Sequence, residues 1–365
     1  MSISRSGLNR APHASLRLAP RLAFMAALLW QPLHALSATT STQVSVGGLV
    51  ITAKSDDLAA LQALTQVTQT DVFTSGTSTQ THTYTGPTLW SVLNDAGIQT
   101  NSAVKNDILN KVVLATGTDG YKVVYSAGEL SPNFGNEAAL VAWGETLAGS
   151  STATALGSDG FARTTAPLDT KGGRYVSNLS ALQVLNSAST QGATCASCIS
   201  TAISVTGDVL HGGSFDLAAL KALPSVTRTV GGNTYTGVSL WDFISSTVGL
   251  ATDGSVKNDV LDMYLVATGT DGYKATFSMG ELSSAFGNQP DLIAYSMNGV
   301  DLTTTGFARI VAPDDIKQGR WVSNLASLEV FHAMAPVPEP TSLALVLTAL
   351  GLVACGRKRS GGIRP

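Results

Sequence analysis

Four arginines and two tyrosine–lysine pairs, each repeated at a matched place, are the residues of this chain best suited to chemistry. Arginine can hold a carboxylate or a phosphate through two parallel hydrogen bonds, and lysine supplies a flexible cation beside a tyrosine hydroxyl. Together these residue types predict a pocket for a small anion or a sugar. The candidate ligand-binding residues are Tyr121, Lys122, Arg163, Arg174, Tyr273, Lys274, Arg309 and Arg320.

The same residues also allow a structural interpretation, which stays open at this point. The Asp-Gly dipeptide before each tyrosine is a strong signal of a hairpin turn, in which the tyrosine packs across the strands. The arginines could form buried ion pairs instead of binding a ligand. Their acidic partners would be Glu129, Asp169, Glu281 and Asp315. We assign no catalytic residue, because the sequence contains no nucleophile elbow, P-loop or dinucleotide fingerprint.

The candidate residues lie in two copies of one sequence. LATGTDGYK at 114–122 returns as VATGTDGYK at 266–274, and GRYVSNL at 173–179 returns as GRWVSNL at 319–325. Each copy is about 140 residues long, a normal size for one domain. We therefore predict two tandem globular domains between processed ends. The predicted parts are a signal peptide at 1–38, repeat domain 1 at 39–185, a linker with a C-x-x-C motif at 186–200, repeat domain 2 at 201–335, a sorting and anchoring segment at 336–359 and a tail at 360–365.

The pattern of apolar residues in each copy predicts an α+β domain with a β-rich core. Helical spacing marks 57–64 and its counterpart 216–223, where Asp216 can act as the N-cap. A second helix should end at Gly97. Alternating apolar residues on both sides of Thr-Asp-Gly predict a hairpin over 111–126. A last strand closes each domain.

The N-terminal segment has the layout of a secretory signal peptide. Four arginines and no acidic residue precede an apolar run over 22–30, and small residues then lead to Ala38. We expect cleavage near Ala38 by signal peptidase. No Arg-Arg pair marks the route for folded proteins, so export should follow the general secretory route.

A sorting feature occupies the other end of the chain. A Pro-Glu-Pro tripeptide precedes an almost wholly apolar stretch over 341–356, which is followed at once by a basic cluster. With help from that cluster, the stretch can cross a thin membrane as a transmembrane helix whose basic end stays cytoplasmic. The residues of this feature are Pro338, Glu339, Pro340, Arg357, Lys358 and Arg359.

This order of tripeptide, apolar helix and basic end resembles the PEP-CTERM sorting signal. The resemblance implies processing by exosortase and transient anchoring in the inner membrane. It also implies a final place in the cell envelope, on the outer surface or outside the cell. Extracellular polysaccharide would be a partner there.

The body of each copy resembles the molybdopterin-binding domain of sulfite-oxidase-like oxidoreductases. The run YTGPTLWSVLNDAGI, the ATGTDGYK hairpin and the late GRYVSNL carry the likeness, which covers most of each copy. It implies a molybdopterin cofactor and an oxidoreductase activity. In that family a cysteine thiolate upstream of the block that begins at Tyr84 also holds the molybdenum. Here 65–83 and 224–234 contain no cysteine, and a hydroxyl cannot replace a thiolate without changing the chemistry of the metal.

We therefore expect the fold without its metal, and molybdopterin is implied by the resemblance alone. The histidines suggest no other metal site, because Asn186 stands near the place that matches His332. Cys195 and Cys198 in the linker predict a local disulfide, since no second C-x-x-C is present to complete a zinc site. The net charge of −3 becomes more negative without the basic ends, which disfavours nucleic-acid binding.

The leading hypothesis is an exported, non-catalytic protein whose two degenerate domains bind a small ligand or a matrix component. The first alternative is a molybdopterin-dependent oxidoreductase that lacks the usual cysteine ligand. The second is a purely structural surface protein. The missing thiolate separates the first alternative from the other two hypotheses.

Overall fold

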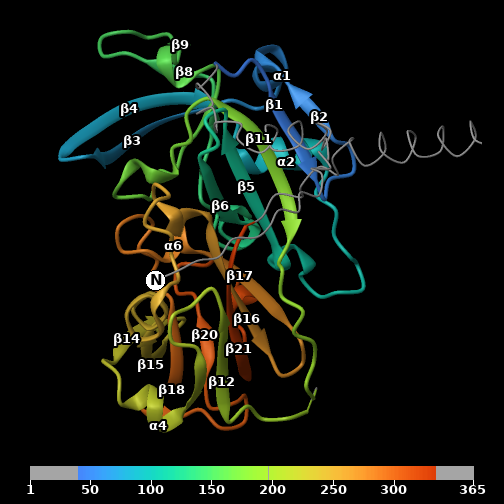
Figure 1. The fold of residues 1–365 in the computed structure, drawn as a ribbon, viewed down its shortest axis with the longest axis vertical. Helices are drawn as coiled ribbons and strands as arrows, with labels where there is room; N and C mark the ends of the chain where they lie inside the picture. Colours follow the sequence, from blue (N-terminus) through green and yellow to red (C-terminus); the bar gives the residue numbers. More distant parts are fainter. Residues whose placement is uncertain (1–39, 196, 334–365) are drawn as a thin grey trace, which may run out of the picture. The chain divides into compact units, whose positions relative to one another are not determined.

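The computed structural model describes residues 40–195 and 197–333. The predicted signal peptide, the PEP-CTERM segment and the predicted transmembrane helix lie outside these residues. Within the described ranges, no helix is long and apolar enough to cross a membrane. The structure is rich in β-strands, and its short helices lie at the ends of strands (Figure 1).

A five-stranded sheet forms the centre of the first half. Its strands are β1 (Val44–Gly48), β2 (Lys54–Asp56), β5 (Lys111–Gly117), β6 (Lys122–Ser126) and β11 (Leu179–Asn186). Their order in the sheet is β2-β1-β11-β5-β6. β1 and β11 pair in parallel, while the other neighbours are antiparallel. The β5–β6 pair confirms the hairpin predicted around Thr-Asp-Gly.

The second half repeats this sheet. Its strands are β12 (Ala202–Gly207), β13 (Gly213–Asp216), β16 (Met263–Gly269), β17 (Lys274–Ser278) and β21 (Leu325–His332). Their order is β13-β12-β21-β16-β17, and β12 and β21 are again the parallel pair. The last strand of each repeat therefore lies at the centre of its sheet, where it is hydrogen-bonded on both edges.

Each half also has a set of strands outside its five-stranded sheet. In the first half these are β3 (Val67–Ser75), β4 (Ser78–Gly86), β8 (Gly144–Thr146) and β9 (Thr154–Ala155), in that order, and a separate pair of β7 (Val141–Ala142) with β10 (Arg163–Thr164). In the second half they are β14 (Val226–Val230), β15 (Asn233–Ser239), β18 (Leu292–Met297) and β19 (Val300–Asp301), with β20 (Arg309–Val311) beside β18.

The helices are short and begin at capping side chains. They are α1 (Leu58–Ala63), α2 (Leu89–Ala96), α3 (Ala127–Leu130), α4 (Leu217–Lys221), α5 (Leu240–Asp242) and α6 (Met279–Leu282). The Asp216 carboxylate accepts the backbone N–H of Ala219 at 2.8 Å, which confirms the predicted N-cap of α4. Gly97 follows α2 at φ 75°, as predicted, because glycine adopts this left-handed conformation at little cost.

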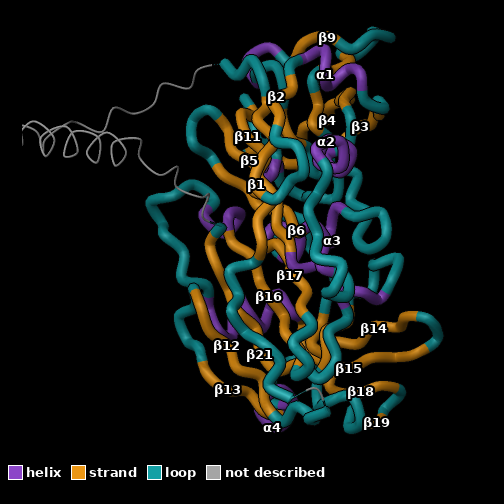
Figure 2. Tube along the Cα trace, turned by 90° about the vertical axis from the view of Figure 1, so that its right-hand side faces the viewer, coloured by secondary structure: helices purple, strands orange, loops and turns teal. Residues whose placement is uncertain are grey.

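The two halves exchange core residues. Leu109 and Phe134 of the first half pack in the main apolar cluster of the second half. Leu261 and Phe286 of the second half pack in the cluster of the first. Figures 1 and 2 place β6 and β17 where the halves meet, and those two strands contact each other. The sequence left open whether the repeats pack together, and in the structure they do.

The segment between the repeats lies against the second half. The backbone N–H of Ala188 donates to the Tyr264 hydroxyl at 2.8 Å. The backbone N–H groups of Thr194 and Cys195 both donate to the carbonyl of Thr270, at 3.0 and 3.1 Å. A disulfide joins Cys195 to Cys198. The segment from Ala188 to Cys195 is therefore attached to the second half by hydrogen bonds.

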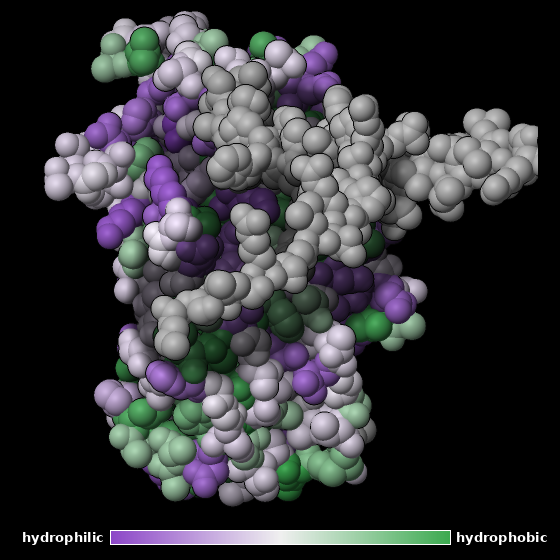
Figure 3. All heavy atoms as spheres, in the orientation of Figure 1, coloured by the Kyte–Doolittle hydropathy of each residue, from purple (hydrophilic) through white to green (hydrophobic). Residues whose placement is uncertain are grey.

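The exposed apolar side chains are distributed along the described chain. Ile51, Leu147, Leu210 and Val300 are each more than half exposed and come from different elements and loops. On the face seen in Figure 3, hydrophobic residues are interspersed with hydrophilic ones. Such scattered apolar residues are normal on protein surfaces and do not by themselves mark a binding site.

Candidate functional site

The two repeated tyrosines of the DGYK turns lie in the contact between the halves. Tyr121 donates its hydroxyl to the carbonyl of Gly173 at 2.7 Å and accepts a hydrogen bond from the Asn258 side chain at 2.9 Å. Tyr273 makes the equivalent bonds in the second half. Its hydroxyl donates to the carbonyl of Gly319 at 2.6 Å and accepts a hydrogen bond from the Asn106 side chain at 2.9 Å. Each DGYK turn thus contacts a Lys-Asn-Asp segment of the other half, which is 257–259 for Tyr121 and 105–107 for Tyr273.

The lysines of the same turns line two related cavities. Tyr121 and Lys122 lie beside Asp259 and Asp262 in a cavity of about 470 Å³. Tyr273 and Lys274 line a cavity of about 490 Å³, where Lys274 donates to the carbonyl of Ser189 at 2.9 Å. Both cavities contain acidic as well as basic side chains, so neither is a purely cationic site for an anion.

Arg174 is fully buried among three carboxylates. Its guanidinium donates to Asp169 at 2.6 and 2.9 Å, to Glu129 at 2.8 Å and to Glu137 at 3.2 Å. The exposed fraction of its side chain is 0%. The structure therefore contains the buried ion pair that the sequence left open, with Glu137 as a further partner.

Arg320 occupies the matching place in the second half. It donates to Asp315 at 2.5 and 2.9 Å and to Glu281 at 2.5 Å. The two arginine clusters are linked, because the Ser126 hydroxyl donates to Glu281 at 3.0 Å. Glu129 and Glu281 also complete capping boxes on α3 and α6, so each carboxylate joins a helix end to an arginine.

Glycine lets the two clusters approach each other. A Cβ atom on Gly128 would overlap Cδ of Arg320, and one on Gly280 would overlap Cδ of Arg174. Each arginine stem therefore packs on the short helix of the opposite half. Arg320 also lines a cavity of about 390 Å³ together with Glu129, Glu137 and Glu281.

We expect the protein to be more stable at about pH 5 than at about pH 8, because this region buries more carboxyl groups than guanidinium groups. Burial raises the pKa of Glu281 from its usual 4.5 to about 7. Burial likewise raises the pKa of Glu137 and of Asp291 well above the usual range. A carboxyl whose pKa is higher in the folded state contributes stability below its unfolded pKa, and this contribution is lost as the pH rises through the folded pKa.

Urea unfolding at several pH values between these limits measures the effect. The free energy of unfolding should fall most steeply between about pH 5 and pH 7. Glu281→Gln is the control, because a glutamine cannot ionise and should flatten part of the curve. A wild-type stability that stays level or rises across this range would contradict the expectation.

Arg163 and Arg309 differ in their partners although their positions match. Arg163 forms an ion pair with Asp159 and lies over the rings of Tyr84 and Tyr175, 5.3 and 5.4 Å from their centroids. Arg309 lies 5.4 Å from the centroid of the Trp321 ring. Its Nε is buried and has no hydrogen-bond partner among the described residues. Burial lowers the pKa of Arg309.

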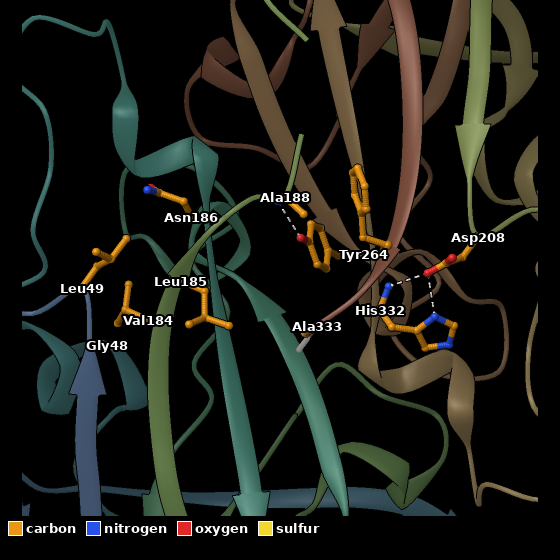
Figure 4. Close-up of a pocket in the computed structure, with 11 residues that line it drawn as sticks. Gly48, Leu49, Val184, Leu185, Asn186, Ala188, Asp208, Tyr264, His332 and Ala333 are labelled. Atoms are coloured by element: carbon orange, nitrogen blue, oxygen red, sulfur yellow. Dashed lines mark hydrogen bonds and ion pairs between the residues drawn. The ribbon is translucent and has the colours of Figure 1, made fainter. Parts of the chain in front are cut away.

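A cavity of about 790 Å³ lies where β11 and β21 end. Figure 4 shows Leu49, Val184 and Leu185 of the first half on one side of it, and Tyr264, Asp208 and His332 on the other. Its remaining lining residues are Gly48, Asn186, Ala188, Phe331 and Ala333. The wall is therefore mostly apolar, and its ionisable groups, Asp208, Tyr264 and His332, lie on the side of the second half, while the amide of Asn186 lies on the side of the first.

The residues present do not fit a thiolate-held molybdenum cofactor. Neither repeat body contains a cysteine, and the two cysteines between the repeats are paired with each other. A disulfide offers no thiolate to a metal. We therefore derive no chemical step through molybdenum.

The acidic residues around His332 were not predicted from the sequence. With Asn186 as the counterpart of His332, the histidines alone indicated no metal ligand. The available signal was the difference between DILNK at 107–111 and DVLDM at 259–263, where a lysine is lost and an acid is gained.

Comparisons with known proteins give little beyond this geometry. No protein-family model matches the sequence, and no curated protein matches it significantly. Among solved structures, one similar chain is the sulfane dehydrogenase SoxCD from Paracoccus pantotrophus, with a TM-score of 0.30 and 17% sequence identity. The match covers 39% of this chain and 37% of that chain, so it spans well under half of either. We base no argument on it.

Proposed function

We propose that this protein is an exported, non-catalytic binding protein that takes a small ligand in the cavity between the ends of β11 and β21. The observation that carries the proposal is the composition of the cavity wall. Leu49, Val184 and Leu185 offer an apolar surface, while the Asp208 carboxylate lies on the opposite side. A ligand with an apolar body and a positively charged end matches this division.

The size of the cavity supports a small molecule. A volume of about 790 Å³ lies within the range of about 300–1,000 Å³ that is usual for small-molecule sites. Asp208 uses Oδ2 to accept both the ring and the backbone N–H of His332, which fixes the carboxylate in place. Its side chain remains 45% exposed, so it can still accept a bond from a ligand.

This ligand class differs from the anion or sugar that the repeated residues suggested. Arg174 and Arg320, the strongest anion-binding candidates, are buried in ion pairs with the protein's own carboxylates. The hydroxyls of Tyr121 and Tyr273 bond across the contact between the halves. These contacts favour a structural role for most of the repeated polar residues. We therefore assign ligand binding to the cavity between the ends of β11 and β21.

Support for export comes from the sequence. The basic and apolar start, the Pro-Glu-Pro tripeptide and the terminal basic cluster occur together in one chain. We propose signal-peptide removal near Ala38 and exosortase processing near Pro338, which would leave the two repeats in the envelope or outside the cell. The lack of a cysteine in either repeat supports the non-catalytic part of the proposal.

Binding of hexylammonium, compared with hexanoate, tests the ligand class. The two probes share an apolar body and differ in charge. We expect hexylammonium to raise the melting temperature of the full chain and hexanoate to leave it unchanged. Intact-mass measurement on protein isolated from the envelope of its own cells would show both whether the ends are removed and whether a small molecule is retained.

Two tryptophan variants localise the binding. Leu49→Trp fills part of the cavity and should abolish the effect of hexylammonium. Ile51→Trp adds the same ring at a residue that is 75% exposed and outside the cavity lining, so binding should persist. Equal responses to both probes, or binding that survives Leu49→Trp, would refute the proposed site.

A further inference from the structure

His332, the last residue of β21, lies among three carboxylates. Its Nδ1 is 2.7 Å from Oδ2 of Asp208, while its Nε2 is 3.2 Å from Oδ2 of Asp259 and 3.9 Å from Oδ1 of Asp262. Nε2 and one oxygen from each of Asp259 and Asp262 all lie within 4.8 Å of one another. Three donor atoms at tetrahedral positions on a zinc ion would be separated by about 3.3 Å. A small inward movement of these side chains would therefore bring Nε2 and the two carboxylate oxygens to the spacing of three metal ligands.

The matched place in the first half already contains a cation. There, the Lys111 ammonium lies 2.7 Å from Oδ2 of Asp107 and donates to Oδ1 of Asn186 at 2.5 Å. Lys111 pairs with Asn186 across β5 and β11, just as Met263 pairs with His332 across β16 and β21. The second half thus has a methionine where the first half has its ammonium.

The acidic charge is also higher in the second half. Asp262 replaces Asn110, and Asp208 replaces Leu49, while the aspartate at 259 matches that at 107. Two lysines also line this cavity, Lys122 of the first half and Lys257, and the structure records no ion pair for either among the described residues. Three carboxylates therefore face one histidine without the ammonium that balances the first half.

One of these carboxylate oxygens lacks a donor. In the first half, Oδ1 of Asn110 accepts the Ser187 hydroxyl at 2.5 Å. Ala333 occupies the place of that serine and cannot donate from its side chain. Oδ1 of Asp262 is accordingly buried without a hydrogen-bond partner among the described residues. A buried acceptor without a donor is costly, and a bound cation would satisfy it.

We propose that Nε2 of His332 and the carboxylates of Asp259 and Asp262 bind a divalent first-row transition metal ion such as Zn²⁺. An imidazole with two carboxylates suits zinc better than calcium, which prefers six or more oxygen ligands. Asp208 holds Nδ1–H of His332 and so presents Nε2 to the metal, which is the common arrangement around a metal-binding histidine. Three protein ligands leave one position open to the cavity that Asp259 and Asp262 line.

The site would connect the end of β21 to the contact between the halves. Asp259 and Asp262 are the first and last residues of a short 3₁₀ helix that follows Asn258. The Asn258 side chain donates to the hydroxyl of Tyr121 in the first half. A metal ion here should therefore stabilise the folded protein as well as bind to it. Asp208 and His332 also line the larger cavity, whereas Asp259 and Asp262 do not, so the metal site does not depend on the ligand proposed there.

Titration of the untagged, metal-free full chain with Zn²⁺ tests the site, with the disulfide kept oxidised. We expect one Zn²⁺ per chain and a higher melting temperature, and no comparable response to Ca²⁺. Asp262→Asn and His332→Asn restore the residues of the first half and should weaken Zn²⁺ binding at least 100-fold. Asp208→Asn should weaken it by about 10- to 100-fold, the usual effect of losing a residue that orients a metal ligand.

Met263→Lys is the decisive variant, because it installs the ammonium of the first half beside Asp259. It should abolish Zn²⁺ binding, and its urea unfolding must show a single cooperative transition, because Met263 is fully buried in the apolar cluster of the second half. Met263→Leu keeps the size and lacks the charge, so binding should persist. Absence of Zn²⁺ binding in the wild type, preference for Ca²⁺, or binding that survives both Asp262→Asn and Met263→Lys would overturn the proposal.

Discussion

Replacing Arg174 by alanine is expected to lower the free energy of unfolding by about 3–5 kcal/mol, because it leaves a set of buried carboxylates without their cation. Asp169, Glu129 and Glu137 all bond to this one guanidinium, and the exposed fraction of each of these acidic side chains is 4% or less. The variant loses stability because its buried carboxylates no longer have a cationic partner. The intact ion pair itself need not be a net source of stability.

The loss of unfolding free energy in Arg174→Ala should depend on pH. Loss of side-chain packing alone would give the same loss at every pH. Burial already raises the pKa of Glu137 and of Asp169 in the intact protein. Without Arg174 these groups will take up protons more readily, so the variant should lose less stability at about pH 5 than at about pH 8. Urea unfolding of the variant and the wild type at both values measures the difference.

Arg228→Ala is the matched control for this experiment. The Arg228 side chain is only partly buried and forms no ion pair among the described residues, where it bonds to the backbone carbonyl of Thr227 at 3.0 Å. Its removal should change stability by no more than about 0.5 kcal/mol. A loss for Arg174→Ala as small as this, or equal losses at both pH values, would show that the buried carboxylates do not depend on Arg174.

Local signals predicted the elements that build each half. Asp216 and Gly97 mark helix ends by their own chemistry, and the Thr-Asp-Gly hairpin needs only neighbouring residues to form. The acidic partners of Arg174 and Arg320 could also be named from the sequence, because a long buried side chain with a fixed charge requires carboxylates nearby.

The strands β3 and β4 were missed because they lack the usual apolar alternation. Threonines face each other along this hairpin, with Oγ1 atoms of Thr68 and Thr85 and of Thr70 and Thr83 each 2.9 Å apart. Threonine favours strands through its β-branched side chain, yet a threonine-rich stretch also has the composition of a loop. Without alternating apolar residues, the sequence does not distinguish a strand from a loop in this stretch.

The group around His332 could not be assembled from spacing. Asp208 follows β12, Asp259 and Asp262 precede β16, and His332 ends β21. These segments meet only because β12, β21 and β16 lie side by side in one sheet. A comparison of the two repeats shows which residues changed, but only the strand order shows that the changed residues share one place.

Truncating Phe134 to alanine is expected to destabilise both halves together, by about 3–5 kcal/mol, because this side chain fills the core of the half to which it does not belong. Phe134 is 7% exposed and packs in the cluster of the second half, against Gly319. Its carbonyl also accepts the backbone N–H of Ile316 at 2.9 Å. Phe286 makes the reciprocal contacts with Gly173 and Thr170, so Phe286→Ala should have the same effect on the first half.

Tryptophan fluorescence separates the two halves in this test. Trp90 and Trp143 report on the first half, and Trp241 and Trp321 report on the second, so variants that retain one pair can follow each half alone. In the wild type both pairs should report one coincident unfolding transition, because neither half has a complete core by itself. Phe134→Ala should shift both transitions equally, whereas Val300→Ala, at a residue that is 69% exposed, should shift neither. Separate transitions in the wild type, or a shift confined to one half, would mean that the repeats fold independently and that the exchanged phenylalanines only cover their contact.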